Sequence, residues 1–221
     1  MPDVPRGKSV AISRQRGSGG SYVGRAVAER LGLRYFDREM LRTAAEYLNE
    51  QEYSSKKIEQ PVDSWFERLG TLLSLSSLDT GYAPPSPTVI YERELFEFEN
   101  RLIREIVDDH VAVIVGRGAA QTLRGQRGVV TVFVHAPERW RVDRVQQVYG
   151  ITDRAAALQM VQHSDQDRTK FIQAMAGIEW TDARHYDLAI NSAALGFDAA
   201  VDLIVRTVAV RGAAEASTMR V

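Results

Sequence analysis

Short apolar runs alternate along this chain with longer stretches in which apolar residues recur every three or four positions. The short runs occupy residues 9–12, 33–36, 112–115, 129–134 and 188–190. Because these runs are unbroken, they predict strands buried on both faces, as in a parallel sheet. Helices are predicted at the periodic stretches, residues 22–31, 38–48, 62–78, 88–108, 119–123, 137–149, 152–176 and 197–210. The alternation predicts one α/β domain over residues 1–210, with about five mostly parallel strands and helices on both faces of the sheet.

Two regions depart from this alternation. Residues 49–60 are polar and charged, and residues 79–87 contain Gly81 and three prolines, which is a strong break. We therefore expect an inserted element over about residues 49–90. Its apolar helix at residues 62–78 has three open roles: to cover the core, to close over a substrate or to pair with a second copy in a homodimer. Residues 211–221 predict a flexible tail.

The stretch SVAISRQRGSGGSYVG, residues 9–24, joins the first strand to the first helix through three glycines in four positions. Glycines allow backbone N–H groups to approach an anion closely, and a helix N-terminus favours negative charge. This arrangement predicts a phosphate-binding loop. It departs from the pattern G-x-x-x-x-G-K-[ST], since Arg14 occupies the position of the first glycine and Gly20 occupies the position of the lysine.

Two other interpretations of this stretch were weighed. One is a tight strand–helix turn that binds no ligand, and the flanking arginines disfavour it. The other is a dinucleotide-binding fold, because Gly17-x-Gly19 begins that fingerprint and Asp37 follows at about the expected distance. Tyr22 occupies the position of the third glycine, so this fingerprint is incomplete.

Chemically informative residues follow several predicted strands. They are Arg14–Gly20, Asp37, Arg117 and Asn191. Ligands of such sheets bind beyond the carboxyl ends of the strands, so we expect these residues to meet there. Further arginines lie on two predicted helices, Arg141 and Arg144 on one and Arg168 on the next. Arginine grips phosphate with a bidentate fork, which favours phosphoryl transfer over solvated helix faces.

Composition narrows the possibilities further. The 221 residues carry 28 basic and 29 acidic side chains, a balance that argues against a general nucleic-acid binder. The absence of cysteine excludes disulfides and thiolate metal sites. No apolar run is long enough to span a membrane, and residues 1–8 lack the apolar core of a signal peptide, so we expect a cytoplasmic protein. The four histidines show no metal-ligand spacing.

Several ordered motifs resemble one known family. ISRQRGSGGSYVGRAVAERLGLRYFDREML is similar to the opening of the cytidylate kinase-like family, a branch of the P-loop nucleoside monophosphate kinases. The segments VIVGRGA, VFVHAPERWRVDRV, SDQDRTKF and YDLAINSAALG resemble its middle and end, so the resemblance covers about residues 9–207. It implies a three-layer P-loop kinase fold with a helical insert and a lid at about residues 145–180. It also implies transfer of the γ-phosphoryl group of ATP to CMP or dCMP, with Mg²⁺.

The resemblance also assigns roles to individual residues. It implies cofactor binding by Gly17, Ser18, Gly19, Gly20, Ser21, Tyr22 and Asn191, with Ser21 as the Mg²⁺ ligand. It implies substrate binding by Asp37, Arg38, Arg117, Arg141 and Asp165, and catalytic roles for Arg144 and Arg168. Because the loop lacks its lysine, we hypothesise that Arg14 or Arg16 supplies the missing charge. Two alternatives stay open: a kinase of another small-molecule acceptor, and a non-catalytic nucleotide-binding regulatory protein.

Overall fold

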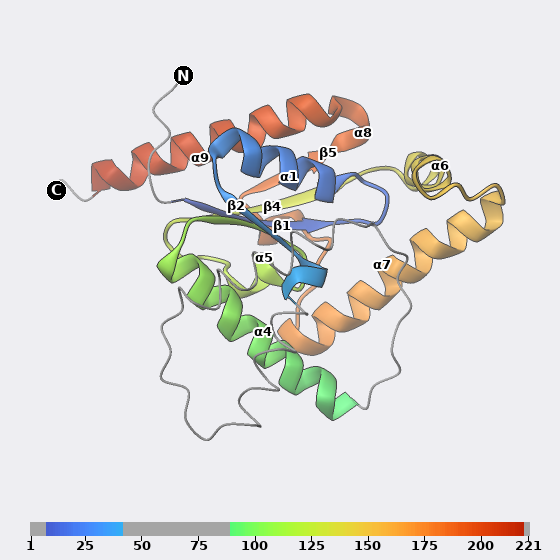
Figure 1. Ribbon diagram of the computed structural model, residues 1–221, viewed down its shortest axis with the longest axis horizontal. Coiled ribbons are helices and arrows are strands. Elements are labelled where there is room, and N and C mark those ends of the chain that lie inside the picture. The colour runs from blue at the N-terminus through green and yellow to red at the C-terminus, as the bar shows by residue number, and fades with distance from the viewer. Residues whose placement is uncertain (1–7, 42–88, 219–221) are drawn as a thin grey trace.

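The computed structural model describes residues 8–41 and 89–218, which contain a five-stranded parallel sheet (Figure 1). The strands are β1 (Ser9–Arg14), β2 (Arg34–Asp37), β3 (Ala112–Val115), β4 (Val129–His135) and β5 (Leu188–Asn191). Their order across the sheet is β2-β3-β1-β4-β5, and every neighbouring pair is parallel. All five strands therefore end at the same edge, with β1 at the centre.

Helices cover both faces of this sheet. They are α1 (Gly20–Leu31), α4 (Val89–Asp109), α5 (Ala119–Thr122), α6 (Glu138–Tyr149), α7 (Arg154–Ala176), α8 (Ser192–Leu195) and α9 (Phe197–Thr218), with a 3₁₀ turn at Ala183–His185. Figure 1 shows α1 and α9 on one face and α4, α5 and α7 on the other. The predicted α/β fold with a parallel sheet between two helical layers is confirmed.

The alternation of side chains along β1 explains why both faces need a helical layer. Val10 and Ile12 are fully buried in one core cluster with residues of α1 and α9, among them Val27. Ala11 belongs to a second cluster, which contains Ile103 of α4 on the opposite face. A strand that is apolar on both sides must be covered twice, which is why β1 lies at the centre of the sheet.

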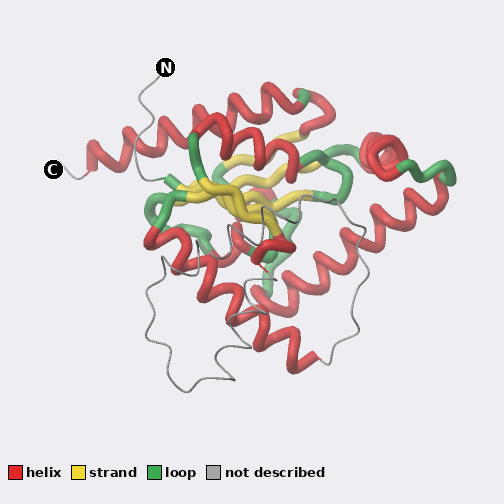
Figure 2. Tube along the Cα trace, viewed as in Figure 1, coloured by secondary structure: helices red, strands yellow, loops and turns green. Residues whose placement is uncertain are grey.

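The α6–α7 pair forms a hairpin beyond the carboxyl ends of the strands (Figure 2). It has a small core of its own, in which Val142 and Val145 of α6 pack on Ala157 and Val161 of α7. Gly150, at φ 65°, ends α6 with the left-handed conformation that glycine adopts most easily. The hairpin spans residues 138–176 and overlaps the range of about 145–180 that was predicted for the lid.

Two helix ends differ from the sequence-based expectation. The cap of α7 is Asp153, whose carboxylate accepts a hydrogen bond from the N–H of Ala155, and not Thr152. Helix α9 continues to Thr218, whereas the tail was expected to begin at residue 211. The segment RGAAEAST is rich in alanine, the strongest helix former, and this favours continuation of the helix.

Several predictions concern segments that the structure does not describe. They are the helix over residues 42–48, the loop at 49–60, the helix at 62–78, the break at 79–87 and so nearly all of the insert at 49–90. Among the described helices, none combines the length and the apolarity that a membrane crossing requires.

Candidate active site

The glycine loop connects the central strand to the first helix at the carboxyl edge of the sheet. The N–H of Gln15 donates to Val134 O (3.1 Å), and the first bond of the helix runs from Val23 N to Gly19 O (2.9 Å). Among the described residues, none accepts a hydrogen bond from the N–H groups of Gly20, Ser21 or Tyr22. These three donors and the helix dipole favour an anion at this end of α1.

The glycines of the loop make room for neighbouring parts of the protein. Gly17 (φ 81°) and Gly19 (φ 78°) have backbone conformations that are strained for other residues. A Cβ on Gly17 would come within 2.6 Å of the carbonyl oxygen of Arg141, and one on Gly19 within 2.6 Å of Cζ of Phe197. The loop is therefore packed tightly between α6 and the start of α9.

Ser18 shapes the loop from within. Its side chain is fully buried, and its Oγ lies 2.9 Å from Gln15 O and 3.0 Å from Val134 O. Oγ of Ser192, at the start of α8, donates to Ser18 O (2.7 Å). The Ser18 hydroxyl thus faces carbonyl oxygens of the protein, while Ser21 and Tyr22 are exposed on the first turn of α1.

Arg14 occupies the space in front of Gly20. A Cβ on Gly20 would overlap Cβ of Arg14 and lie 3.0 Å from its Cγ. The guanidinium then contacts Gly116, which follows β3 and has φ 91°. Burial lowers the pKa of Arg14, and the nearby charges of Arg38 and Arg16 lower it further, against the opposing effects of Tyr35 and Asp37.

Arg168 of α7 reaches the same place from the opposite layer. Burial lowers its pKa to about 9, with further lowering by the charges of Arg14, Arg38 and Arg16 and an opposing effect of Asp165. Its Nη1 lies 3.5 Å from Asp165 Oδ1, and its guanidinium lies 5.0 Å from the ring centroid of Trp180. Positive charge is thus concentrated beside the glycine loop by four predicted site arginines, Arg14, Arg16, Arg38 and Arg168.

Arg141 and Asp165 fasten the hairpin to the loop. The buried Arg141 donates from Nε to Ala136 O (2.9 Å) and from Nη1 to Arg16 O (3.1 Å) and Asp165 Oδ2 (2.6 Å). Asp165 Oδ1 also accepts from the N–H of Arg16 (3.4 Å). Both residues were predicted to bind substrate, and the structure places them between the glycine loop and the α6–α7 hairpin.

The side chain of Arg16 turns towards the hairpin. Its guanidinium lies 4.7 Å from the ring centroid of Tyr149 at the end of α6, and Nη2 lies 3.6 Å from the sulfur of Met160 in α7. Neither contact has a signal in the sequence, because Tyr149 and Met160 belong to no motif. Of the two arginines proposed to replace the lysine, Arg16 contacts the α6–α7 hairpin and Arg14 lies under the start of α1.

Arg144 lies in a separate aromatic cluster. Its guanidinium is 4.5 Å from the ring centroid of Phe197, which also contacts the rings of Tyr22 (5.3 Å) and Trp140 (6.0 Å). The structure thus does not bring Arg144 together with Arg14 and Arg168. Phe197 was missed as a site residue, and its only sequence signal is its position at the start of the last helix.

The remaining predicted residues have local partners. Nε and Nη2 of Arg117 lie 2.8 Å and 2.6 Å from Oε1 of Glu99, a fully buried carboxylate of α4 that the sequence did not single out. Asp37 Oδ1 accepts from the N–H groups of Glu39 and Met40. The side chain of Asn191 caps α8 by accepting hydrogen bonds from the N–H groups of Ala193 and Ala194.

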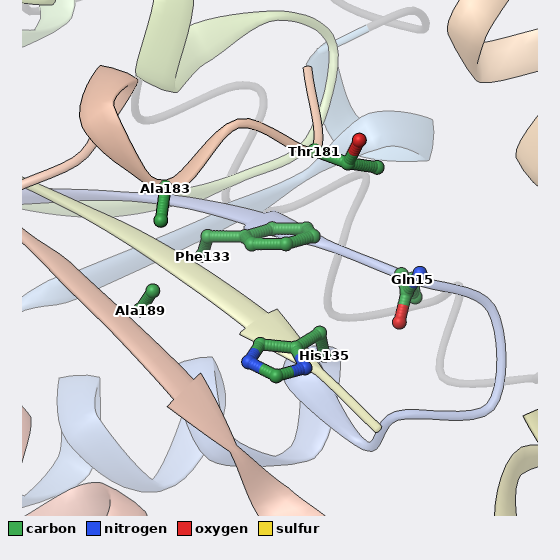
Figure 3. Close-up of a pocket in the computed structure, with 6 residues that line it drawn as sticks. All are labelled: Gln15, Phe133, His135, Thr181, Ala183 and Ala189. Atoms are coloured by element: carbon green, nitrogen blue, oxygen red, sulfur yellow. The ribbon is translucent and has the colours of Figure 1, made fainter. Parts of the chain in front are cut away.

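A pocket of about 230 Å³ lies on the other side of Gln15 (Figure 3). Its floor is formed by the stacked rings of Phe133 and His135, which come from the end of β4. Burial lowers the pKa of His135, as does the charge of Arg141. The pocket shares Gln15 with the glycine loop, but none of the clustered arginines lines it.

Metal binding at this edge would rest on few protein ligands. Within residues 8–41 and 89–218, no group of three or more histidine, aspartate or glutamate side chains is arranged to hold a metal ion. Mg²⁺ at kinase sites is held largely by substrate phosphates, waters and one or two protein oxygens. The exposed hydroxyl of Ser21 on the first turn of α1 fits that limited requirement.

Sheet, loop and hairpin together define a kinase-like P-loop protein. The family model described as the cytidylate kinase-like family matches residues 9–194, and the chain belongs to this family. The resemblance found in the sequence motifs is thus confirmed.

Individual relatives add detail about the fold. A structure of an uncharacterized protein from Eubacterium ventriosum ATCC 27560 has a TM-score of 0.67 at 21% identity and covers 91% of this chain and 98% of its own. A gluconokinase from Sinorhizobium meliloti 1021 has a TM-score of 0.49 at 16% identity, covering 98% and 97%. A curated uronate isomerase from Corynebacterium glutamicum is 30% identical over 149 residues, or 66% of this chain. The match spans only 28% of the length of that protein.

Proposed function

We propose that this protein transfers the γ-phosphoryl group of ATP to a nucleoside monophosphate, CMP or dCMP. An oxygen of the acceptor phosphate forms a bond to the γ-phosphorus, the bond from that phosphorus to the β–γ bridging oxygen breaks, and ADP leaves. The main observation in support is the convergence of Arg14, Arg38 and Arg168 beside the glycine loop. Membership of the cytidylate kinase-like family supports the choice of acceptor.

The chain's own contribution to this reaction is positioning and charge neutralisation. Phosphoryl transfer needs little covalent chemistry from the protein, and arginines around the moving group stabilise its charge. The N–H groups of Gly20, Ser21 and Tyr22 hold the phosphates of ATP, and Arg168 reaches the transferred group from α7. Closure of the α6–α7 hairpin, fastened through Asp165, excludes water and so disfavours hydrolysis.

The base and the metal have separate places in this proposal. The aromatic surface of Tyr22 and Phe197, with Arg144 over it, offers the adenine a stacking partner next to the loop. Ser21 would hold Mg²⁺ together with phosphate oxygens, and the ion would supply further charge neutralisation. Arg38 and Arg117 lie on the β2–β3 side, where the acceptor phosphate would bind.

A coupled assay that follows ADP tests the proposal. The protein is mixed with ATP and Mg²⁺, and CMP, dCMP, AMP, GMP or UMP is added in turn. Turnover that depends on CMP or dCMP supports the proposal. Turnover only with AMP, GMP or UMP supports a kinase of a different small-molecule acceptor. Tight ATP binding without turnover for any acceptor supports the alternative of a non-catalytic nucleotide-binding regulatory protein. The presence of Gly20 at the lysine position favours that alternative.

A further inference from the structure

The side chain of another basic residue, Arg14, packs against the position of the missing lysine. In a P-loop the lysine leaves the first turn of the helix and reaches the β- and γ-phosphates. Here that residue is Gly20, and its front is filled by Cβ and Cγ of Arg14. A side chain at position 20 would overlap Arg14, so a lysine there and the arginine below it exclude each other.

The strand geometry explains how Arg14 reaches this place. Arg14 is the last residue of β1 and pairs with Val134 of β4. Val10 and Ile12 point to the α1 face, and since side chains alternate along a strand, Arg14 points there as well. Its aliphatic part passes under Gly20, and its guanidinium reaches the end of β3 at Gly116.

A second glycine completes this arrangement. A Cβ on Gly116 would overlap Nη1 of Arg14 and lie 2.8 Å from its Cζ. Gly116 also adopts φ 91°, and its N–H continues the sheet by donating to Ile12 O (2.9 Å). The two glycines, one on α1 and one after β3, thus form a channel that fits the Arg14 side chain.

Arg14 differs from three other site arginines in the partners of its guanidinium. Arg16, Arg141 and Arg168 have hydrogen-bond or ion-pair partners, whereas Arg14 has none among the residues that the structure describes. It lies near the charges of Arg38 and Arg168 and is partly buried. A partly buried cation among like charges is stabilised by an anion between them.

We propose that Arg14 is the phosphate-binding cation of this site, taking the part of the P-loop lysine from the strand instead of the helix, and that Gly20 is its required counterpart. The inference rests on the proposed function in that it assumes polyphosphate binding at the loop. It assigns to Arg14 the positive charge that the P-loop lysine would supply, while Arg16 contacts the α6–α7 hairpin.

A residue swap tests this inference. Binding of ADP and of inorganic tripolyphosphate is measured by calorimetry for the wild type, Arg14→Ala, Gly20→Lys and the double variant Arg14→Ala/Gly20→Lys. We expect Arg14→Ala to weaken both ligands by about 10- to 100-fold, as the loss of a charged hydrogen-bonding partner does. Gly20→Lys alone should lose binding because of the overlap, and the double variant should recover most of the lost affinity.

Controls separate this inference from the proposed function. Arg30→Ala removes an exposed cation at the far end of α1 and should leave both affinities unchanged. Circular dichroism identifies any variant that fails to fold, and Arg14→Lys then provides a conservative second test, with binding between wild type and Arg14→Ala. Wild-type affinity in Arg14→Ala overturns the inference.

If the wild type binds tripolyphosphate but transfers no phosphoryl group to CMP, the proposed function fails while the Arg14 comparison still decides this inference. If the wild type binds neither ligand, both are overturned.

Discussion

Arg141 shows how much of this site depends on one buried side chain. It joins the carbonyl oxygens of Ala136 and Arg16 and the carboxylate of Asp165, three segments that are far apart in the sequence. The side chains of Arg141 and Asp165 are only 6% and 20% exposed. Removal of Arg141 leaves Asp165 with only its longer contacts to Arg168 (3.5 Å) and to the N–H of Arg16 (3.4 Å), and it takes a charged donor away from two carbonyl oxygens.

We therefore expect Arg141→Met to lower the free energy of unfolding by about 3–5 kcal/mol. Arg154→Met is the matched control, because Arg154 also pairs with an aspartate, Asp143, but both side chains are about half exposed. An exposed pair contributes about 0–1 kcal/mol. Urea unfolding of both variants measures the difference, and equal losses would contradict the role of Arg141 as a buried clamp.

Gly19 makes a second prediction at the scale of one residue. Gly19→Ala introduces strain at φ 78° and also an overlap with the Phe197 ring, whereas Gly32→Ala introduces strain alone, at φ 66° with open space around it. The overlap adds about 1–3 kcal/mol of destabilisation. Chemical denaturation of the two variants should therefore differ by that amount, and Phe197→Leu should reduce the difference. Identical losses would show that the ring moves aside freely.

At the scale of elements, the α6–α7 hairpin is held to the glycine loop by few contacts. The Arg16 guanidinium bridges Tyr149 and Met160, one from each helix. An exposed cation–aromatic contact contributes about 0.5–1 kcal/mol, so its loss shifts an opening equilibrium severalfold. We therefore expect Arg16 to stabilise the arrangement in which the hairpin contacts the loop.

Tyr149→Ala should increase amide hydrogen exchange in α6 and α7 by about two- to fivefold, as expected for the loss of one such contact. Exchange in β1 and β4 should not change, since those strands lie in a separate core. Val148→Ala is the control, because Val148 is a neighbouring exposed apolar residue, 49% exposed. Faster exchange throughout the protein would indicate general destabilisation instead of lid opening.

The same scale shows what sequence could predict. The strands at residues 112–115 and 129–134 and the loop at residues 14–20 were predictable because their signals are local: an unbroken apolar run, or glycines between a strand and a helix. The partners of the arginines were not. Arg141 and Arg144 are one helical turn apart on α6, yet one is buried against Asp165 and the other lies on Phe197. Such contacts depend on how distant elements pack, which periodicity does not report.

At the scale of the whole molecule, a nearly neutral chain concentrates positive charge at one edge of its sheet. The formal net charge is −1, yet beside the loop the charges of Arg16 and Arg38 lower the pKa of both Arg14 and Arg168. Concentrated charge in a partly desolvated site raises the local concentration of anions. Binding of nucleotide polyphosphates should therefore couple to the protonation of this cluster.

The pKa of Arg168 determines the sign of that coupling. It is lowered from the ordinary arginine value to about 9, so between these two values the unfolded chain binds more protons than the folded one. The free energy of unfolding contributed by this group therefore rises with pH across that window, and its destabilising effect is fully present at neutral pH. A bound polyphosphate offsets the repulsion only while Arg168 is charged.

We thus expect ADP to raise the melting temperature strongly near neutral pH and less above about pH 9, where the ligand-free protein has released this proton. Thermal unfolding with and without ADP across this range measures the effect. In Arg168→Met, ADP should raise the melting temperature only slightly and with little dependence on pH, because the titrating group is gone. Lys170→Met removes an exposed cation two positions further along α7 and should retain the wild-type profile. A wild-type profile in Arg168→Met would exclude Arg168 from the polyphosphate site, since the charge that couples pH to binding would then lie elsewhere.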